Sequence, residues 1–292
     1  MITKNDINEV VAEALDVLKR GGLILYPTDT VWGIGCDATN EAAVQRVFVL
    51  KRRAEAKSLV LLACDLDMVA RYIRKIPSIA VDLVSVNDAP MTIVYPGAVV
   101  QCVAGEGTAP EGRATLTSPA AFGLAPSVVA ADGSVGIRIP RAGSTGVDSK
   151  GDDWDERPVS AGAVFCNRLI YRLRRPLVST SANISGEPAP ASFPEISPEI
   201  RAGVDYIVPA SVSGLALPGL SRSGSPSPAA LPGLSRSGSP SPASRSGSGL
   251  ALPNSGRTAP FAATVRFDDS ASGRPSQILK LGLDGEVEII RP

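Results

Sequence analysis

The chain has 292 residues, of which 44% are hydrophobic, so it holds enough apolar material for one large domain or two modest ones. Lys and Arg together number 29, as do Asp and Glu, which excludes an overall charge that would attract nucleic acid or an anionic membrane. The absence of histidine excludes Ser-His-Asp hydrolysis, Cys-His catalysis and histidine-ligated zinc. Any chemistry must therefore use hydroxyls, carboxylates, amides and cations.

The cysteines and the N-terminus bear on the compartment. Cys36, Cys64, Cys102 and Cys166 form no C-x-x-C pair, which favours reduced, buried thiols over a zinc knuckle or a disulfide framework. The first 22 residues place acids among the apolar positions and lack the apolar run of a signal peptide. No segment approaches the roughly 18 uninterrupted apolar residues of a membrane span. We expect a cytoplasmic protein without a membrane partner.

The predicted elements alternate between helices and strands. Apolar residues at helical spacing predict a helix over Ile7–Lys19, which ends at Gly21 and Gly22, and residues 23–26 predict a buried strand. Asn40 is a candidate N-cap for a second helix with a buried stripe at positions 43, 44, 47, 48 and 50. Further helices are expected at 65–73 and 79–86, and further strands at 58–63, 91–95, 135–139 and 176–180. This alternation predicts an α/β or α+β sheet domain.

Two stretches break the alternation. The segment ALPGLSRSGSPSP occurs at residues 216–228 and again at 230–242, and its Ser, Pro and Gly content predicts a disordered insertion. A duplicated linker is favoured there over a basic tail that touches RNA. The other stretch, residues 143–162, clusters Asp152, Asp153, Asp155 and Glu156. Because these acids show no regular ligand spacing, a solvated loop is favoured over a magnesium site.

Small polar residues follow the first predicted strand. Thr28, Asp29 and Thr30 stand at its end, and Gly33 and Gly35 follow, where backbone can pass close to a ligand. A strand-to-turn connection with incidental threonines would look the same.

Two further groups strengthen the case for a site. Lys51, Arg53 and Lys57 lie at the end of the second helix, where cations can complement the helix dipole or hold a polyphosphate. Residues 179–186 bring Ser179, Ser181 and other hydroxyls and amides directly after a strand. Hydroxyls and backbone N–H groups in such a place suit an anion or nucleotide pocket.

Taken in order, YPTDTVWG, KRR with KSL, APMT, VGIRIPR and STSANISGEP resemble the YrdC-like threonylcarbamoyl-AMP synthases. The resemblance spans residues 15–209, and the C-terminal GRPSQILKLGLDGEVEIIRP is similar to the closing segment of that family. Trp32 stands where the family usually has Tyr, Ser58 replaces Pro, Ala89 replaces Gly and Gln277 replaces Thr. Leu62 occupies a position where many members carry a polar residue that touches threonine.

The resemblance implies an open twisted mixed sheet flanked by helices, with a concave basic cleft. It implies a catalytic domain over residues 1–209, a repeat insertion over 210–272 and a closing segment over 273–292. The implied activity joins L-threonine, bicarbonate and ATP into threonylcarbamoyl-AMP and pyrophosphate, the first step toward the t6A base of tRNA. ATP would bring Mg²⁺ with it, and the implied partners are a downstream threonylcarbamoyl transferase and weakly bound tRNA.

The family's functional residues map onto matching positions. Lys51 and Arg53 would be catalytic, as exposed cations that hold the triphosphate. Arg138 would meet the carbamate or the carboxylate. The implied substrate-binding residues are Thr28, Thr30, Trp32, Lys57, Thr92, Arg138, Ser179, Ser181, Asn183, Ser276 and Arg291.

Two other functions stay open at this point. The same scaffold can serve as an RNA-binding module, which would release no pyrophosphate in response to threonine and bicarbonate. A related domain also occurs in O-carbamoyltransferases that use carbamoyl phosphate, but these enzymes usually carry large additional domains.

Overall fold

The computed structural model describes residues 6–53, 59–87, 89–101, 123–140, 160–213, 265–268 and 271–292. Its helices are α1 (Ile7–Lys19), α2 (Glu41–Leu50), α3 (Leu66–Tyr72), α4 (Ser78–Val86), α5 (Ala161–Leu173) and α6 (Pro198–Ala202), with short 3₁₀ turns η1 (Pro126–Val128) and η2 (Phe193–Glu195). Its strands are β1 (Ile24–Tyr26), β2 (Gly33–Gly35), β3 (Val60–Leu62), β4 (Met91–Tyr95), β5 (Val135–Arg138), β6 (Leu177–Ser181), β7 (Tyr206–Ile207), β8 (Ser211–Val212), β9 (Val265–Arg266), β10 (Gln277–Leu281) and β11 (Val287–Arg291).

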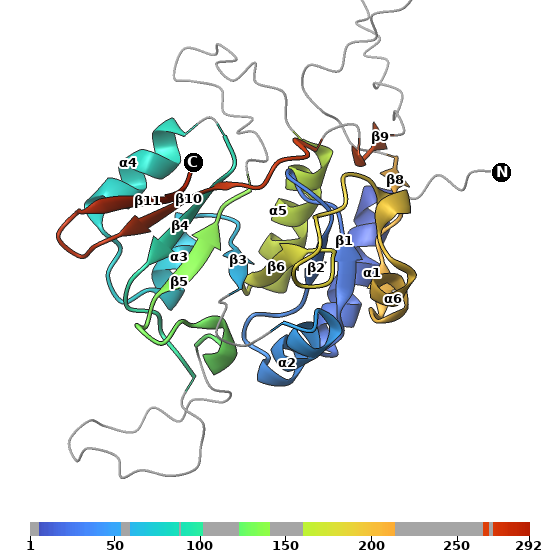
Figure 1. The fold of residues 1–292 in the computed structure, drawn as a ribbon, viewed down its shortest axis with the longest axis horizontal. Helices are drawn as coiled ribbons and strands as arrows, with labels where there is room; N and C mark the ends of the chain where they lie inside the picture. Colours follow the sequence, from blue (N-terminus) through green and yellow to red (C-terminus); the bar gives the residue numbers. More distant parts are fainter. Residues whose placement is uncertain are drawn as a thin grey trace, which may run out of the picture.

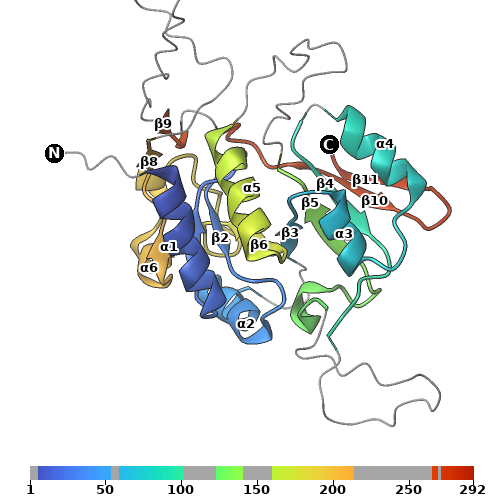
Figure 2. The same ribbon diagram turned by 180° about the vertical axis from the view of Figure 1, so that it is seen from behind.

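Nine of these strands form one mixed sheet in the order β11-β10-β4-β5-β3-β6-β2-β1-β7 (Figure 1). Three neighbouring pairs are parallel (β10 with β4, β3 with β5, β1 with β7), and the other five are antiparallel. Helices α1 and α5 lie over one face of β1, β2 and β6 (Figure 2). The predicted α/β architecture, with an open mixed sheet flanked by helices, is confirmed.

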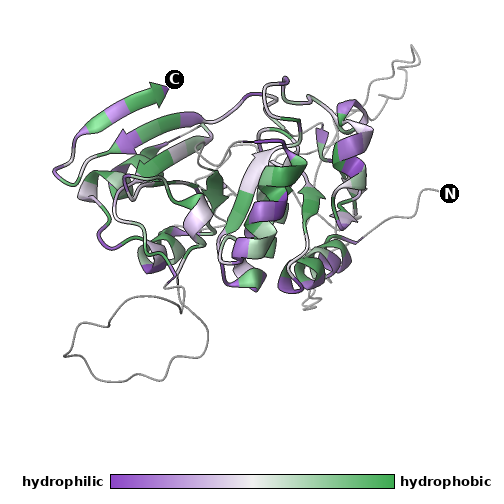
Figure 3. Ribbon diagram, turned by 60° about the horizontal axis from the view of Figure 1, so that its bottom comes forward, coloured by the Kyte–Doolittle hydropathy of each residue, from purple (hydrophilic) through white to green (hydrophobic). Residues whose placement is uncertain are grey.

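Both long helices at the N-terminal end are capped, α2 by Asn40 as predicted and α1 by Asp6, which the sequence analysis did not single out. Asp6 accepts a hydrogen bond from the Asn8 N–H (2.8 Å) at the start of α1, and Asn40 accepts one from the Ala43 N–H (3.1 Å) at the start of α2. Gly21, with φ +79°, follows α1 in the left-handed region that favours glycine. In Figure 3 the strands in the middle of the molecule are mainly green and the helices carry both colours, as expected for amphipathic helices around a buried sheet.

Eight of the helices and strands were missing from the prediction, namely α5, α6, β2 and β7 to β11. Residues 161–173 form α5, which buries Phe165, Leu169 and Ile170 at helical spacing, although the sequence before it is irregular. Residues 33–35 form β2, where the sequence predicted a loop. Gly35 packs against the Tyr26 ring, since an added Cβ would lie 2.7 Å from it. The predicted closeness of Gly35 to a ligand is therefore wrong, because its role is this tight packing inside the sheet.

The insertion predicted over residues 210–272 begins and ends with residues that the structure describes, and these include strands β8 and β9. Strand β8 pairs antiparallel with β9, with Val212 opposite Val265. After β9, Phe267 is buried and its ring lies 6.0 Å from Phe165 and 6.4 Å from Trp32. The repeat and the other residues at 214–264 lie outside the described residues, so the chain leaves and re-enters the described structure at two neighbouring strands.

Deleting residues 215–255 is expected to leave the melting temperature and any activity nearly unchanged. A Ser/Pro/Gly tract cannot bury enough apolar area to offset its ordering entropy, and the deletion keeps β8, β9 and eleven residues to join them. Differential scanning calorimetry of the two proteins tests this, and a fall of many degrees would mean that the deleted tract packs on the domain.

Candidate active site

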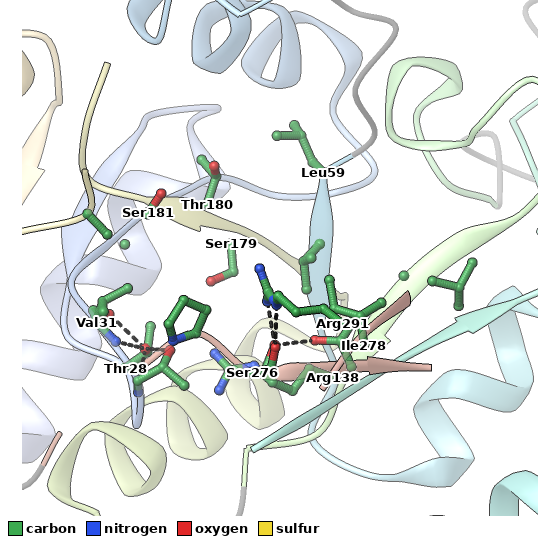
Figure 4. Close-up of a pocket in the computed structure, with 18 of the residues that line it drawn as sticks. Thr28, Val31, Leu59, Arg138, Ser179, Thr180, Ser181, Ser276, Ile278 and Arg291 are labelled. Carbon is green, nitrogen blue, oxygen red and sulfur yellow. Dashed lines mark hydrogen bonds between the residues drawn. The ribbon is translucent and has the colours of Figure 1, made fainter. Parts of the chain in front are cut away.

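One cavity gathers most of the predicted site residues. Its volume is about 410 Å³, within the usual range for small-molecule sites. Nine predicted residues line it: Thr28, Thr30, Arg53, Thr92, Arg138, Ser179, Ser181, Ser276 and Arg291. Figure 4 shows Thr28, Ser179, Ser276 and Arg291 around the same space, although they come from different parts of the chain.

Strand register explains why these residues meet. Across the sheet, Thr92 lies opposite Arg138, Val60 lies opposite both Gly136 and Ser179, and Ser181 lies opposite Gly33. Residues directly opposite each other, or two apart on one strand, share a face of the sheet. These residues therefore form a single row over five strands. Gly136 has no side chain in the middle of this row and so leaves space for the cavity. A Cβ at this position would lie 3.4 Å from the Thr92 methyl carbon.

The alternate residues of the same strands form the hydrophobic core. Leu61, Ile93, Ile137 and Val178 are each at most 2% exposed. Each central strand thus presents apolar side chains to one face of the sheet and either polar side chains or glycine and valine to the cavity.

Several hydroxyl groups of the cavity already make hydrogen bonds within the protein. The Thr28 hydroxyl donates to the Val31 carbonyl (2.7 Å) and accepts from the N–H groups of Thr30 (3.0 Å) and Val31 (3.2 Å), so it shapes the turn. Thr92 and Ser276 share a hydrogen bond of 2.7 Å between their hydroxyls. Arg291 donates to the Ser276 carbonyl through Nε (2.9 Å) and thereby ties β11 to this wall.

Three arginines reach the cavity from separate elements. Arg53 follows α2, Arg138 ends β5 and Arg291 ends β11. Burial lowers the pKa of both Arg53 and Arg291 from the usual value. Because none of the described lining residues is acidic, the cavity suits an anionic ligand.

The prediction that Lys51 is an exposed cation is wrong. Lys51 is 1% exposed, and its ammonium donates to the backbone carbonyls of Ser181 and Asn183 (2.6 Å to Asn183). The Lys51 carbonyl in turn accepts from the Ser185 N–H (2.9 Å). Burial, and secondarily the nearby Arg53, lowers the pKa of Lys51 to about 8. Lys51 therefore joins the end of α2 to the loop after β6 and does not line the cavity.

Trp32 and Asn183 also lie outside the cavity wall, contrary to prediction. Trp32 is 2% exposed, donates from Nε1 to Asp268 (2.6 Å) and stacks obliquely on Phe193 at 5.0 Å. Asn183 uses its amide to donate to the carbonyls of Ile184 (3.0 Å) and Glu187 (2.6 Å), which shapes the loop. Aromatic packing holds Trp32 and loop hydrogen bonds hold Asn183, so neither side chain lines the cavity.

Other residues singled out in the sequence are now placed or fall outside the described part. Leu62 is fully buried in β3 and does not line the cavity. Lys57, Ser58, Cys102 and the acidic cluster at 152–156 lie outside the described residues. Cys36 and Cys166 are buried free thiols, and burial raises the pKa of both, whereas Cys64 is a free thiol that is only half-buried. Among the described residues, no group of three acidic or thiol side chains could hold a metal ion.

Asp29 is the residue whose role the sequence did not reveal. Its carboxylate forms an ion pair with Arg138, and both side chains are less than 10% exposed. The sequence placed Asp29 between two cavity threonines but gave no signal for its partner, which is 109 residues away.

The fold and the cavity define an α/β protein with a cationic, hydroxyl-lined site for a small anionic ligand. Residues 16–110 and 162–217 match the Sua5/YciO/YrdC family profile, which is described as "Telomere recombination". The chain belongs to this family.

The similar proteins include several with the same name. The chain is 31% identical over 208 residues to "Threonylcarbamoyl-AMP synthase" of Stenotrophomonas maltophilia, covering 70% of this chain and 88% of that protein. It is 29% identical over 215 residues to the protein of the same name from Halorhodospira halophila, covering 73% and 90%. The crystal structure of P. abyssi Sua5 with L-threonine shares the fold, with a TM-score of 0.50 and 22% identity. That comparison covers 69% of this chain and 46% of the Sua5 chain, so this chain spans less than half of that protein.

No helix in the described ranges is both long and apolar enough to cross a membrane.

Proposed function

We propose that the protein is an L-threonylcarbamoyladenylate synthase, which converts L-threonine, bicarbonate and ATP into threonylcarbamoyl-AMP and pyrophosphate. The observation that carries the proposal is the meeting of three arginines and a row of hydroxyls in one cavity of about 410 Å³. The names of the relatives, which this chain covers nearly completely, support it.

The reaction suits a site without histidine. The threonine amine adds to CO₂ derived from bicarbonate, loses a proton and becomes a carbamate. A carbamate oxygen then attacks the α-phosphorus of ATP, and the bond to the pyrophosphate leaving group breaks. Catalysis of this kind depends on positioning the substrates and on neutralising the phosphate charge. The protein itself needs to transfer few protons.

The cavity residues take roles that follow from their chemistry. Arg53 would bind the triphosphate, and Arg138 would bind the carboxylate or the carbamate, since a guanidinium offers paired donors to both. Ser179 and Ser181 would donate to phosphate or threonine oxygens, and Arg291 would hold the Ser276 wall against the ligand. Lys51 would act on the site through the loop that it holds.

The remaining parts of the proposal concern partners and location. Mg²⁺ would enter bound to ATP, where it neutralises the phosphates. A threonylcarbamoyl transferase would consume the product in the cytoplasm, and direct contact with tRNA would be weak.

A mass-spectrometric search for threonylcarbamoyl-AMP tests the proposal. The protein is incubated with ATP, threonine and ¹³C-bicarbonate, and the product is expected to carry one ¹³C atom. Reactions without threonine or without bicarbonate serve as controls. Pyrophosphate release in the absence of threonine, with no labelled adduct, would contradict the proposal.

The proposed site also predicts an order of amino-acid substrates. A pocket that reads the threonine hydroxyl through Thr30 or Ser179 would lose that hydrogen bond with 2-aminobutyrate, at about 1–3 kcal/mol. Serine loses only a methyl group, so its kcat/KM should fall roughly 10-fold. We expect kcat/KM for pyrophosphate release to decrease from threonine to serine to 2-aminobutyrate. Equal turnover of threonine and 2-aminobutyrate would show that the pocket reads shape alone.

A further inference from the structure

We propose that Asp29 is a positioning residue that holds the Arg138 guanidinium in the cavity wall and so sets the affinity for the substrate carboxylate. The inference rests on the proposed function, because it names the element of the site that recognises the amino acid.

The ion pair between Asp29 and Arg138 is buried directly behind the cavity. The side chains are 9% and 5% exposed, and the contact joins Asp29 Oδ1 to one terminal nitrogen of Arg138. A guanidinium carries five N–H donors in a rigid plane. One terminal nitrogen faces Asp29, so the ion pair restrains the guanidinium at the wall of the cavity that Arg138 lines.

Stability alone does not explain such a pair. Two buried charges lose their hydration, and replacing a buried ion pair with apolar residues is often neutral or stabilising. Removing one partner, in contrast, leaves an uncompensated buried charge. The arrangement therefore costs free energy that an apolar wall would not, and a fixed cation facing an anion site is what it provides.

The backbone of Asp29 and Thr30 also holds the chain segment that leads into the cavity wall. Its carbonyl accepts from the Ser272 N–H (2.9 Å), and the Thr30 carbonyl accepts from the Gly273 N–H (2.9 Å). These bonds lead the chain toward Pro275 and Ser276, both of which line the cavity. The turn at 28–31 thus fixes Arg138 through a side chain and the C-terminal segment through backbone bonds.

The test measures threonine and ATP separately in Asp29→Asn, which keeps the size of the side chain and removes its charge. Misplacing a binding group can cost up to about 100-fold, so we expect threonine Kd by calorimetry and threonine KM to rise by about 10- to 100-fold. ATP KM should stay within about 3-fold, because Arg53 lies on another element. The matched control is Asp132→Asn, which breaks an exposed ion pair with Lys280 (3.0 Å) away from the cavity and should leave both values unchanged.

A double-mutant cycle separates positioning from a general structural role. If Asp29 acts through Arg138, Asp29→Asn should add no further loss of threonine affinity to Arg138→Met. Losses that add, an unchanged threonine Kd in Asp29→Asn, or an equal rise for threonine and ATP would each overturn the inference. If either single variant does not fold, the double variant decides, because it carries no unpaired buried charge. A rise in threonine Kd with ATP KM near the wild-type value supports the inference, and an equal rise for both substrates overturns it. A wild-type protein that binds neither threonine nor ATP would refute the proposed function instead.

Discussion

Replacing Arg53 with alanine is expected to lower kcat/KM for ATP by about 30- to 1000-fold without unfolding the protein. Arg53 lines the cavity at the end of α2, and burial already lowers its pKa, so its charge lies in a partly dehydrated site. Removing one electrostatic donor from such a site costs roughly 2–4 kcal/mol of transition-state stabilisation. Steady-state pyrophosphate release, with circular dichroism as a check on folding, gives the measurement.

The neighbouring Arg52 supplies the matched control. It is exposed, forms an ion pair with Glu199 (2.8 Å) and does not line the cavity. Exposed ion pairs contribute about 0–1 kcal/mol to stability, so Arg52→Ala should keep both folding and rate near those of the wild type. Equal losses in the two variants would mean that general positive charge, and not Arg53 itself, serves the reaction.

Replacing Lys51 with methionine is expected to lower both stability and kcat. Methionine fills a similar volume but cannot donate to the carbonyls of Ser181 and Asn183. A buried carbonyl left without its donor costs about 1–3 kcal/mol, which is a shift of several degrees in melting temperature for a domain of this size. Because Ser181 lines the cavity, movement of this loop should also slow turnover.

Two variants distinguish this role from direct phosphate binding. Lys19→Met removes an exposed lysine from the last turn of α1 and should change neither property. Lys51→Arg keeps the charge but places a larger, planar group in the buried site. If Lys51 holds the loop, Lys51→Arg should recover little of the stability that Lys51→Met loses. If Lys51 binds phosphate, Lys51→Arg should recover much of the activity. A Lys51→Met protein with unchanged melting temperature and a large loss of ATP affinity would show that Lys51 binds phosphate and not the loop.

Local patterns in the sequence were sufficient for most of the secondary structure. Caps such as Asn40 and terminators such as Gly21 act within a few residues, so α1, α2 and the short apolar strands β3 to β6 could be located in advance. Strand β2 could not, because its two glycines indicate a turn until Tyr26 and Val178 are known to pack against them. Helix α5 carried a readable apolar stripe, but it begins directly after an irregular acidic stretch.

The site was predictable as a set of residue types and not as an arrangement. Alternation within VGIRI and LVSTS already separates Arg138 and Ser179 from their apolar neighbours Ile137 and Val178. That β5 and β6 both flank β3, and so bring these residues together, depends on long-range pairing with no local signal. Lys51 shows the converse error, since a cation at a helix end looks exposed until the loop that covers it is in place.

The pairing of β8 with β9 has a consequence for how this gene can change. Val212 and Val265 are opposite each other, so the chain between them starts and finishes at nearly one point of the surface. Closing a flexible loop costs free energy that grows only with the logarithm of its length, and a further 13-residue copy in a loop of about 50 residues would add about 0.2 kcal/mol. A cost of this size is small beside the free energy of unfolding, so one further copy would hardly affect folding. Two identical 13-residue segments already stand at this position, at 216–228 and 230–242, and the same position should accept an engineered reporter domain whose own termini lie close together.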